Sequence, residues 1–153
     1  MSRVRRRVAT VVALLVVPWM VLFVRDTRSL YFPVGFHDLG SPAFTTIWDY
    51  YFRYSIGPAA LPGYLVAYGI GALLLALAVV SALLGVVWRE DARITAALLV
   101  LAGLSNAWFA LGFLRRSGYV AVPVGTVLSW VVVWWYYAED FRRVVAVTDT
   151  ERN

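Results

Sequence analysis

Four arginines are the side chains in this sequence best suited to binding chemistry, because they flank apolar runs on one predicted side of a membrane. Arg25 and Arg28 follow the first apolar run, and Arg115 and Arg116 follow the third. Guanidinium groups bind phosphate bidentately, so four of them at one end of a helical bundle could hold an anion such as a lipid phosphate. Alternatively, they extend to lipid headgroups or pair with the aspartates of the neighbouring loop.

A second place to look for chemistry is the only histidine, His37, which stands next to Asp38. The chain has no cysteine, and no spacing of His, Asp or Glu resembles a metal-ligand motif. No nucleophile elbow or glycine-rich phosphate loop occurs. We therefore expect no metal, no cofactor and no catalytic residue.

The most polar side chain inside an apolar run is Asn106, with Ser105 beside it. A buried amide needs a hydrogen-bond partner, so we expect Asn106 to bond to another helix. A role in a permeation or substrate path is the alternative.

Apolar runs long enough to cross a bilayer must position these residues. Hydrophobic residues make up 61% of the 153-residue chain, too many for an ordinary soluble domain. We predict one all-α membrane domain, residues 1–153, in which four transmembrane helices form an up-down bundle. The predicted spans are 8–24, 62–88, 94–114 and 119–138, with an outer loop at 25–61 and a tail at 139–153.

The second and third spans form a hairpin closed by the charged turn 89–93. Small residues recur at helical spacing in both arms, and close backbone approach is what packs helices in lipid. We expect these faces to meet, with Gly71 in the first arm and Gly103 and Ala107 in the second lying between the two arms.

The outer loop contains a predicted short amphipathic helix. Ser41-Pro42 is typical of a helix start, and Gly57-Pro58 of a stop. Asp49 and Arg53 are four residues apart and can pair. This helix would lie in the membrane interface; the alternative is an irregular aromatic loop that fills gaps between helices.

Arginine counts predict the orientation. With the N-terminus inside, nine arginines lie on the cytoplasmic side and five outside. This bias favours a multi-pass protein of the cell membrane with both termini cytoplasmic. Because the net charge of +5 lies at membrane flanks, we expect no nucleic-acid partner.

A family resemblance covers the segment from about Trp88 to Tyr137. Its motifs are Arg89-Glu90-Asp91-x-Arg93-x-Thr95, Leu99-Val100-Leu101-Ala102-Gly103-Leu104, Arg115-Arg116-x-Gly118-Tyr119-x-Ala121-x-Pro123-Val124-Gly125-Thr126 and Trp134-Trp135. These resemble an uncharacterised family of small four-helix integral membrane proteins of halophilic archaea. The resemblance implies an archaeal cytoplasmic membrane and no activity.

Taken together, these observations predict a non-enzymatic membrane protein with an accessory or scaffold role. Its expected partners are the lipid bilayer, an anionic lipid, and a membrane-protein partner or a second copy. Two alternatives stay open. One is a small transporter or channel subunit acting as an oligomer. The other is a membrane enzyme that acts on lipid or isoprenoid phosphate with the outer arginines, His37 and Asp38.

Overall fold

The protein has a mixed α/β fold in the computed structural model, which describes residues 3–88 and 91–150. The all-α bundle of four transmembrane helices predicted from the sequence is therefore wrong. The turn residues Arg89 and Glu90 and the end of the predicted tail, 151–153, lie outside the described residues. The elements in chain order are α1 (Arg3–Ala13), β1 (Met20–Val24), β2 (Thr27–Phe32), β3 (Gly35–Asp38), β4 (Phe44–Thr46), α2 (Ile47–Phe52), the 3-10 turn η1 (Pro58–Ala60), α3 (Gly63–Val87), α4 (Ala92–Leu114), β5 (Tyr119–Val122) and α5 (Val124–Thr150).

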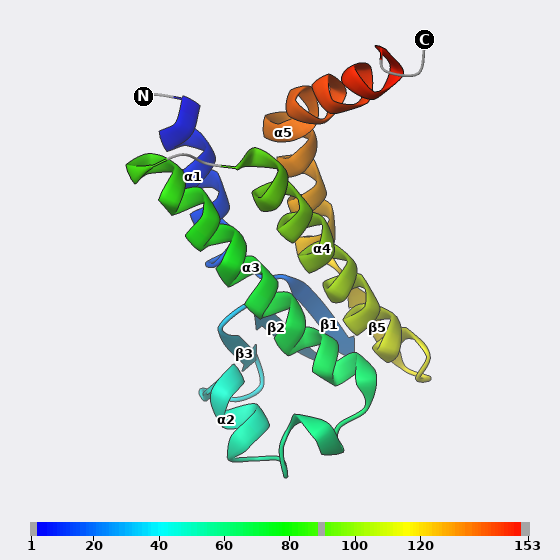
Figure 1. Ribbon diagram of the computed structural model, residues 1–153. Helices are drawn as coiled ribbons and strands as arrows, with labels where there is room; N and C mark the ends of the chain where they lie inside the picture. The colour runs from blue at the N-terminus through cyan, green and yellow to red at the C-terminus, as the bar shows by residue number, and fades with distance from the viewer. Residues whose placement is uncertain (1–2, 89–90, 151–153) are drawn as a thin grey trace.

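The two longest apolar helices, α3 and α4, form an antiparallel hairpin that runs the length of the molecule (Figure 1). They begin and end within two residues of the predicted spans 62–88 and 94–114. The side chain of Asp91 caps the start of α4 by accepting a hydrogen bond from the Arg93 N–H. Small residues such as Ala78 and Ala102 are fully buried, which lets the helices approach closely.

The first predicted span, 8–24, is divided between a helix and a strand. α1 ends at Ala13, and after Pro18 the chain continues as β1. Proline has no N–H to donate within a helix, and the β-branched residues around it favour extended backbone. β1 pairs with β2 through the two-residue turn Arg25-Asp26.

The last predicted span, 119–138, is divided in the same way but in the opposite order. β5 occupies Tyr119–Val122, Pro123 follows, and α5 begins at Val124 and continues through most of the predicted tail. β5 pairs antiparallel with β1, far away in sequence, with Leu22 opposite Ala121.

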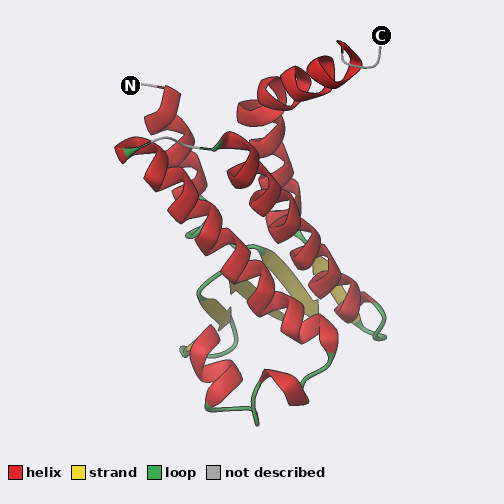
Figure 2. Ribbon diagram, viewed as in Figure 1, coloured by secondary structure: helices red, strands yellow, loops and turns green. Residues whose placement is uncertain are grey.

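The strands form one antiparallel sheet in the order β4-β3-β2-β1-β5. Figure 2 shows the sheet behind one end of the α3–α4 hairpin, while α1 and α5 lie behind the other end. Two apolar cores follow from this arrangement. One joins α1, α3, α4 and α5 around Val11, Leu75 and Leu99, and the other joins the sheet to the hairpin around Met20 and Phe109.

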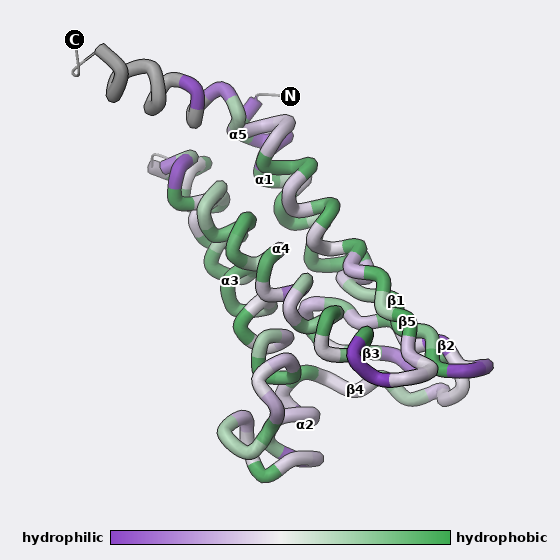
Figure 3. The backbone as a smooth tube through the Cα atoms, turned by 90° about the vertical axis from the view of Figure 1, so that its right-hand side faces the viewer, coloured by the Kyte–Doolittle hydropathy of each residue, from purple (hydrophilic) through white to green (hydrophobic). Residues whose placement is uncertain are grey.

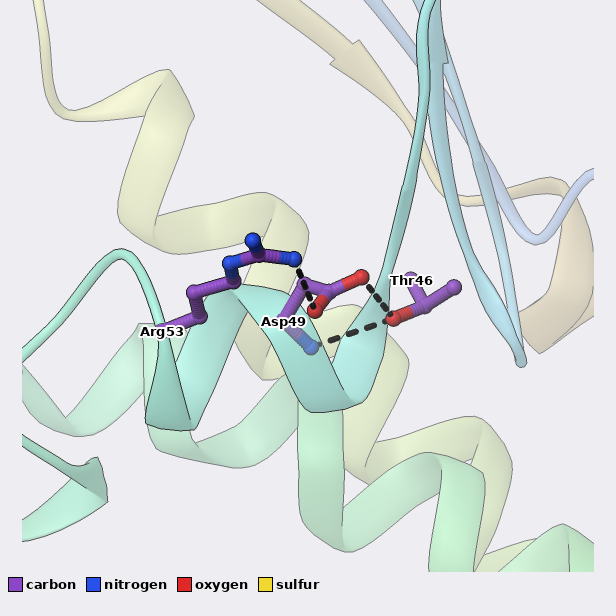
Figure 4. Close-up of polar contacts among 3 residues, drawn as sticks. All are labelled: Thr46, Asp49 and Arg53. Atoms are coloured by element: carbon purple, nitrogen blue, oxygen red, sulfur yellow. Dashed lines mark hydrogen bonds and ion pairs between the residues drawn. The ribbon is translucent and has the colours of Figure 1, made fainter.

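The short helix of the outer loop begins later than predicted, at Ile47 rather than near Ser41-Pro42, because residues 44–46 form an edge strand. Figure 4 shows how it starts: the Thr46 Oγ1 accepts from the Asp49 N–H at 3.1 Å and donates to the Asp49 Oδ2 at 2.9 Å. The predicted pair is present, with Arg53 Nη1 3.8 Å from Asp49 Oδ1.

Candidate functional site at the sheet end of the hairpin

Arg115 and Arg116 are placed by the end of α4. Arg115 is the C-cap residue, and the Arg116 N–H donates to the carbonyl of Phe113 at 2.9 Å, which ends the helix in a tight turn. Gly118 follows with a φ of +83°, a conformation that favours glycine, and leads into β5. Both arginine side chains are exposed at the sheet end of the molecule.

The two arginines line a pocket of about 370 Å³ between the start of α3 and the end of α4. Its other walls are mostly aromatic and apolar: Gly63, Tyr64, Trp108, Leu111 and Gly112. A Cβ at Gly112 would overlap the ring of Tyr64, so glycine at this position is what allows α3 and α4 to meet here.

Aromatic rings support both guanidinium groups. The Arg115 Cζ lies 5.8 Å from the centre of the Trp108 ring, and the Arg116 Cζ lies 5.8 Å from the centre of the Tyr64 ring. No carboxylate in the described part of the chain forms an ion pair with either arginine. A guanidinium beside an aromatic ring keeps in-plane N–H donors for another group, so this pocket offers two cations to an anion.

The other two arginines of the predicted cluster reach the same end but not the same pocket. Arg25 occupies the β1–β2 turn with a φ of 52°, and Arg28 lies on β2 with its Cζ 5.6 Å from the centre of the Phe23 ring. Because Val24 pairs with Tyr119, this turn is next to the loop that carries Arg115 and Arg116. Only Arg115 and Arg116 line the pocket.

His37 and Asp38 lie on β3 and make local contacts. The His37 Nδ1 is 3.1 Å from the Ala43 carbonyl oxygen, which can only accept, so Nδ1 is the donor. The Asp38 Oδ1 accepts from the Gly40 N–H at 3.0 Å. Among the residues that the structure describes, no three His, Asp or Glu side chains converge to hold a metal ion.

Asn106 lies in a buried polar network where both divided segments change from helix to strand. Its Nδ2 donates to the Trp19 carbonyl at 3.0 Å and to the Thr126 Oγ1 at 3.2 Å. The Thr126 hydroxyl in turn donates to the Gly103 carbonyl at 2.8 Å. Trp19 and Thr126 were not predicted as the partners, because they come from the two segments that the sequence predicts as membrane spans rather than as joints between a helix and a strand.

The predicted packing residues have different neighbours. The Ser105 Oγ donates to the Ala67 carbonyl at 2.7 Å, which joins α4 to α3. Gly71 faces the same interface, where an added Cβ would lie 3.4 Å from the Cβ of Ser105. Gly103 faces α5 instead, since its Cβ would lie 2.7 Å from the Trp130 Nε1; Ala107 is half-buried in α4.

One further contact was not predicted from the sequence. The Tyr51 hydroxyl, on α2, donates to the Leu65 carbonyl and accepts from the Gly69 N–H, both in α3. Burial raises the pKa of Tyr51 to about 12, and the hydrogen bond from Gly69 acts in the opposite direction. The available signal in the sequence was Gly69 itself, nearly two turns into α3, since a Cβ at this position would lie 2.8 Å from the Tyr51 ring.

The fold and the pocket define an α/β protein built on a hairpin of two long apolar helices, with an arginine and aromatic pocket at its sheet end. The chain belongs to the family described as "Domain of unknown function (DUF8050)", which matches residues 1–147. No curated protein and no solved structure matches the chain. Family membership therefore assigns no activity.

Proposed function

We propose that this protein is an integral membrane protein, anchored by the α3–α4 hairpin, with an accessory or scaffold role. Both helices are long and apolar enough to cross a membrane. The supporting observation is that the rest of the protein buries only a small part of these two helices. In α3, 28% of the most apolar stretch is buried, and in α4 39%. The core helix of a soluble protein would be mostly buried.

The uncovered surface consists of large apolar side chains along both helices. Exposed side chains of this kind in water form a patch larger than soluble monomers tolerate, whereas lipid solvates them at no cost. The exposed residues on the two helices are Ile70, Leu73, Leu77, Val80, Leu83, Leu84, Val86, Val87, Ile94, Leu101, Leu104, Trp108, Leu111 and Leu114.

The distribution of polar residues supports an orientation. Figure 3 shows hydrophobic residues along α3, α4 and the first part of α5, and hydrophilic residues toward the two ends of the molecule. The N-terminus and the C-terminal part of α5 lie at the end away from the sheet (Figure 1). Because Arg3, Arg5, Arg6 and Arg7 are at that end, the positive-inside rule makes it the cytoplasmic one.

The joints between helix and strand are also compatible with a membrane. Irregular backbone at membrane depth is tolerated only where protein groups satisfy it. The Trp19 carbonyl accepts from the Gly125 N–H at 2.7 Å as well as from Asn106. The Trp19 carbonyl at this joint is therefore satisfied by protein groups.

An accessory or scaffold role fits what the hairpin offers. Residues 63–87 and 94–114 carry no Asp, Glu, Lys, Arg or His, the side chains that proton-coupled carriers use. The pocket with Arg115 and Arg116 is lined by neither His37 nor a described carboxylate, which supports binding of an anion there rather than general-base chemistry on one.

The test uses the absence of cysteine from the chain. Single cysteines are introduced by Ser2→Cys and by Ala59→Cys, the latter at an exposed position just before α3. In intact cells an impermeant thiol reagent should label the Ala59→Cys protein, and the Ser2→Cys protein only after permeabilisation. Carbonate washing should leave both in the membrane fraction.

Release of the protein by carbonate, or equal labelling of the two cysteines in intact cells, would contradict the proposal. Flux of a neutral solute into liposomes containing only the purified chain would replace the accessory role with that of a channel subunit.

A further inference from the structure

We propose that the pocket formed by Tyr64, Trp108, Arg115 and Arg116 binds the phosphate of an anionic membrane lipid, whose chain lies along the exposed face of α4. This inference rests on the proposed insertion of the hairpin into a membrane, and it names the ligand of the pocket.

Charge in the pocket favours an anion. Arg115 and Arg116 are adjacent in sequence, line one pocket and have no ion pair with any described carboxylate. The C-terminus of α4 opposes this with a partial charge of about −0.5, and part of each arginine's charge is used to offset it. Two full positive charges exceed this partial charge, so the pocket remains positive.

The aromatic walls prepare the arginines for phosphate. Trp108 and Tyr64 lie beside one guanidinium each, at 5.8 Å in both cases. Rings that hold the guanidinium groups reduce the side-chain entropy lost on binding, while the donors stay available for two charge-assisted hydrogen bonds.

An apolar stripe leads away from the pocket along α4. Leu101, Leu104, Trp108 and Leu111 are all exposed and recur at spacings of three and four, so they share one face of the helix. From Leu101 to Leu111 this stripe extends about 15 Å, which is about half the thickness of a hydrocarbon core. A lipid chain whose phosphate is in the pocket would therefore cover the stripe to the middle of the bilayer.

Free phosphate has the same anionic chemistry as a lipid headgroup but lacks the acyl chain. The residues that line the pocket distinguish these two ligands. Trp108 and Leu111 line the pocket and belong to the stripe at the same time. Inorganic phosphate would leave these side chains uncovered, whereas a lipid contacts them with its glycerol region and first methylenes.

The experiment compares lipid retention in nanodiscs made from equal parts of phosphatidylglycerol and phosphatidylcholine, followed by native mass spectrometry after release. The wild-type protein should retain one phosphatidylglycerol in preference to phosphatidylcholine. Phosphatidylcholine carries the same phosphate together with a quaternary ammonium group that offsets its charge, so the preference depends on the two cations of the pocket. The Arg115→Gln, Arg116→Gln double variant should therefore lose the preference for phosphatidylglycerol by about 10-fold or more. The matched control is Arg25→Gln, Arg28→Gln, which removes the same charge from the same end outside the pocket and should keep the preference.

A second experiment measures what the acyl chain of the lipid contributes to binding. Titration calorimetry on delipidated protein in detergent should give much weaker binding of inorganic phosphate than of short-chain phosphatidylglycerol. Leu111→Ala should weaken binding of the lipid and leave phosphate affinity almost unchanged, because Leu111 belongs to the apolar stripe whereas Trp108 and Tyr64 are the residues beside the guanidinium groups. Circular dichroism and thermal unfolding identify any variant that fails to fold, and such a variant is replaced by the single change Arg116→Gln.

Equal retention in both double variants would overturn the inference, and so would inorganic phosphate binding as tightly as the lipid. A protein that resists carbonate extraction yet retains lipids without preference refutes only the pocket ligand. A protein that carbonate releases refutes the proposed membrane function, whatever the pocket binds.

Discussion

Two regions of the molecule extend over similar distances with different secondary structure. One is the α3–α4 hairpin, which is continuous helix, and the other consists of the α1–β1 and β5–α5 segments, in which a helix and a strand are combined. α4 reaches about 35 Å with 23 helical residues. Along the same hairpin, α1 contributes about 16 Å with 11 residues and β1 a further 16 Å with five, because a strand rises about twice as much per residue as a helix. A short apolar run can therefore match a long helix when half of it is a strand.

The composition of the two regions explains the difference. α3 is rich in leucine and alanine, which favour a helix and pack closely. β1 reads Met-Val-Leu-Phe-Val and β5 reads Tyr-Val-Ala-Val, and both lie beside a proline. Pro18 and Pro123 stand at the two joints, so a proline accompanies the division of both segments.

The two regions also satisfy their backbones differently. A continuous helix needs no partner for its interior N–H and C=O groups. A segment that changes from helix to strand leaves backbone groups open at the joint, and here Asn106 and Gly125 bond to the carbonyl of Trp19. The hairpin should therefore be sensitive to changes that separate its helices, and the divided segments to loss of a single polar side chain.

The largest effect is expected from Gly112→Val, which tests the hairpin. Its new side chain would overlap the Cβ and ring of Tyr64, and the Cβ cannot rotate away. Overpacking of this kind costs about 3 kcal/mol or more, seen as a lower midpoint in denaturant or thermal unfolding. Gly63→Val is the control, because nothing lies near its added Cβ. Equal stability of both variants would show that α3 and α4 do not meet at Gly112.

Asn106→Leu tests the joint and should have the next largest effect. The change keeps the branched shape and the number of heavy atoms of the side chain but removes a donor to Trp19 and Thr126, which should destabilise the protein by about 1–3 kcal/mol. Ser105→Ala, one residue earlier, removes one bond within the continuous hairpin and should cost about 1 kcal/mol. If Ser105→Ala cost more, the contrast between the two regions would be broken.

The hairpin was predictable from sequence and the divided segments were not. An uninterrupted, uncharged run of 25 residues allows little besides a long helix. The run at 8–24 has similar apolarity, but its last five residues form β1, which pairs with β5 almost a hundred residues away. Length and apolarity do not distinguish a buried strand from a helix, and such distant pairing leaves no local pattern.

The candidate pocket was predictable in part. Arg115 and Arg116 were identified because they lie at the end of an apolar run on the side with fewer arginines. Their aromatic neighbours were not: Trp108 lies two turns earlier in α4, and Tyr64 comes from the other helix. Arg25 and Arg28 were expected beside them, but the sheet holds these two outside the pocket.

Pro18→Ala asks whether proline or strand pairing creates the division. The β1–β2 and β1–β5 pairings and the Asn106 contact remain in this variant, so β1 should stay a strand. Proline restricts the unfolded chain, so its loss should cost only about 0.4–1 kcal/mol. Circular dichroism would measure the outcome: a gain of helix would show that Pro18 alone blocks a continuous first helix.

The smallest effect on stability at neutral pH is expected from Tyr51→Phe, which removes the hydrogen bonds between the Tyr51 side chain of α2 and the hairpin. The variant loses two hydrogen bonds, but the Leu65 carbonyl and the Gly69 N–H are four residues apart in α3 and can then bond to each other. Replacement of one satisfied arrangement by another should cost less than about 0.5 kcal/mol near pH 7. A larger loss would mean that α3 cannot close this bond on its own.

The stability of the same variant should depend less on pH than that of the wild type at high pH. Burial raises the pKa of Tyr51 from its ordinary value of 10.0 to about 12, so between these values the folded protein keeps a proton that the unfolded chain releases. The stability contributed by Tyr51 is therefore fully present below pH 10 and is lost as the pH rises toward 12. Tyr54→Phe removes the same hydroxyl group at an exposed position and is the matched control. The unfolding midpoint of Tyr51→Phe should fall less between pH 9 and pH 12 than that of Tyr54→Phe; equal slopes would show that α2 is held to the hairpin by contacts other than this hydroxyl.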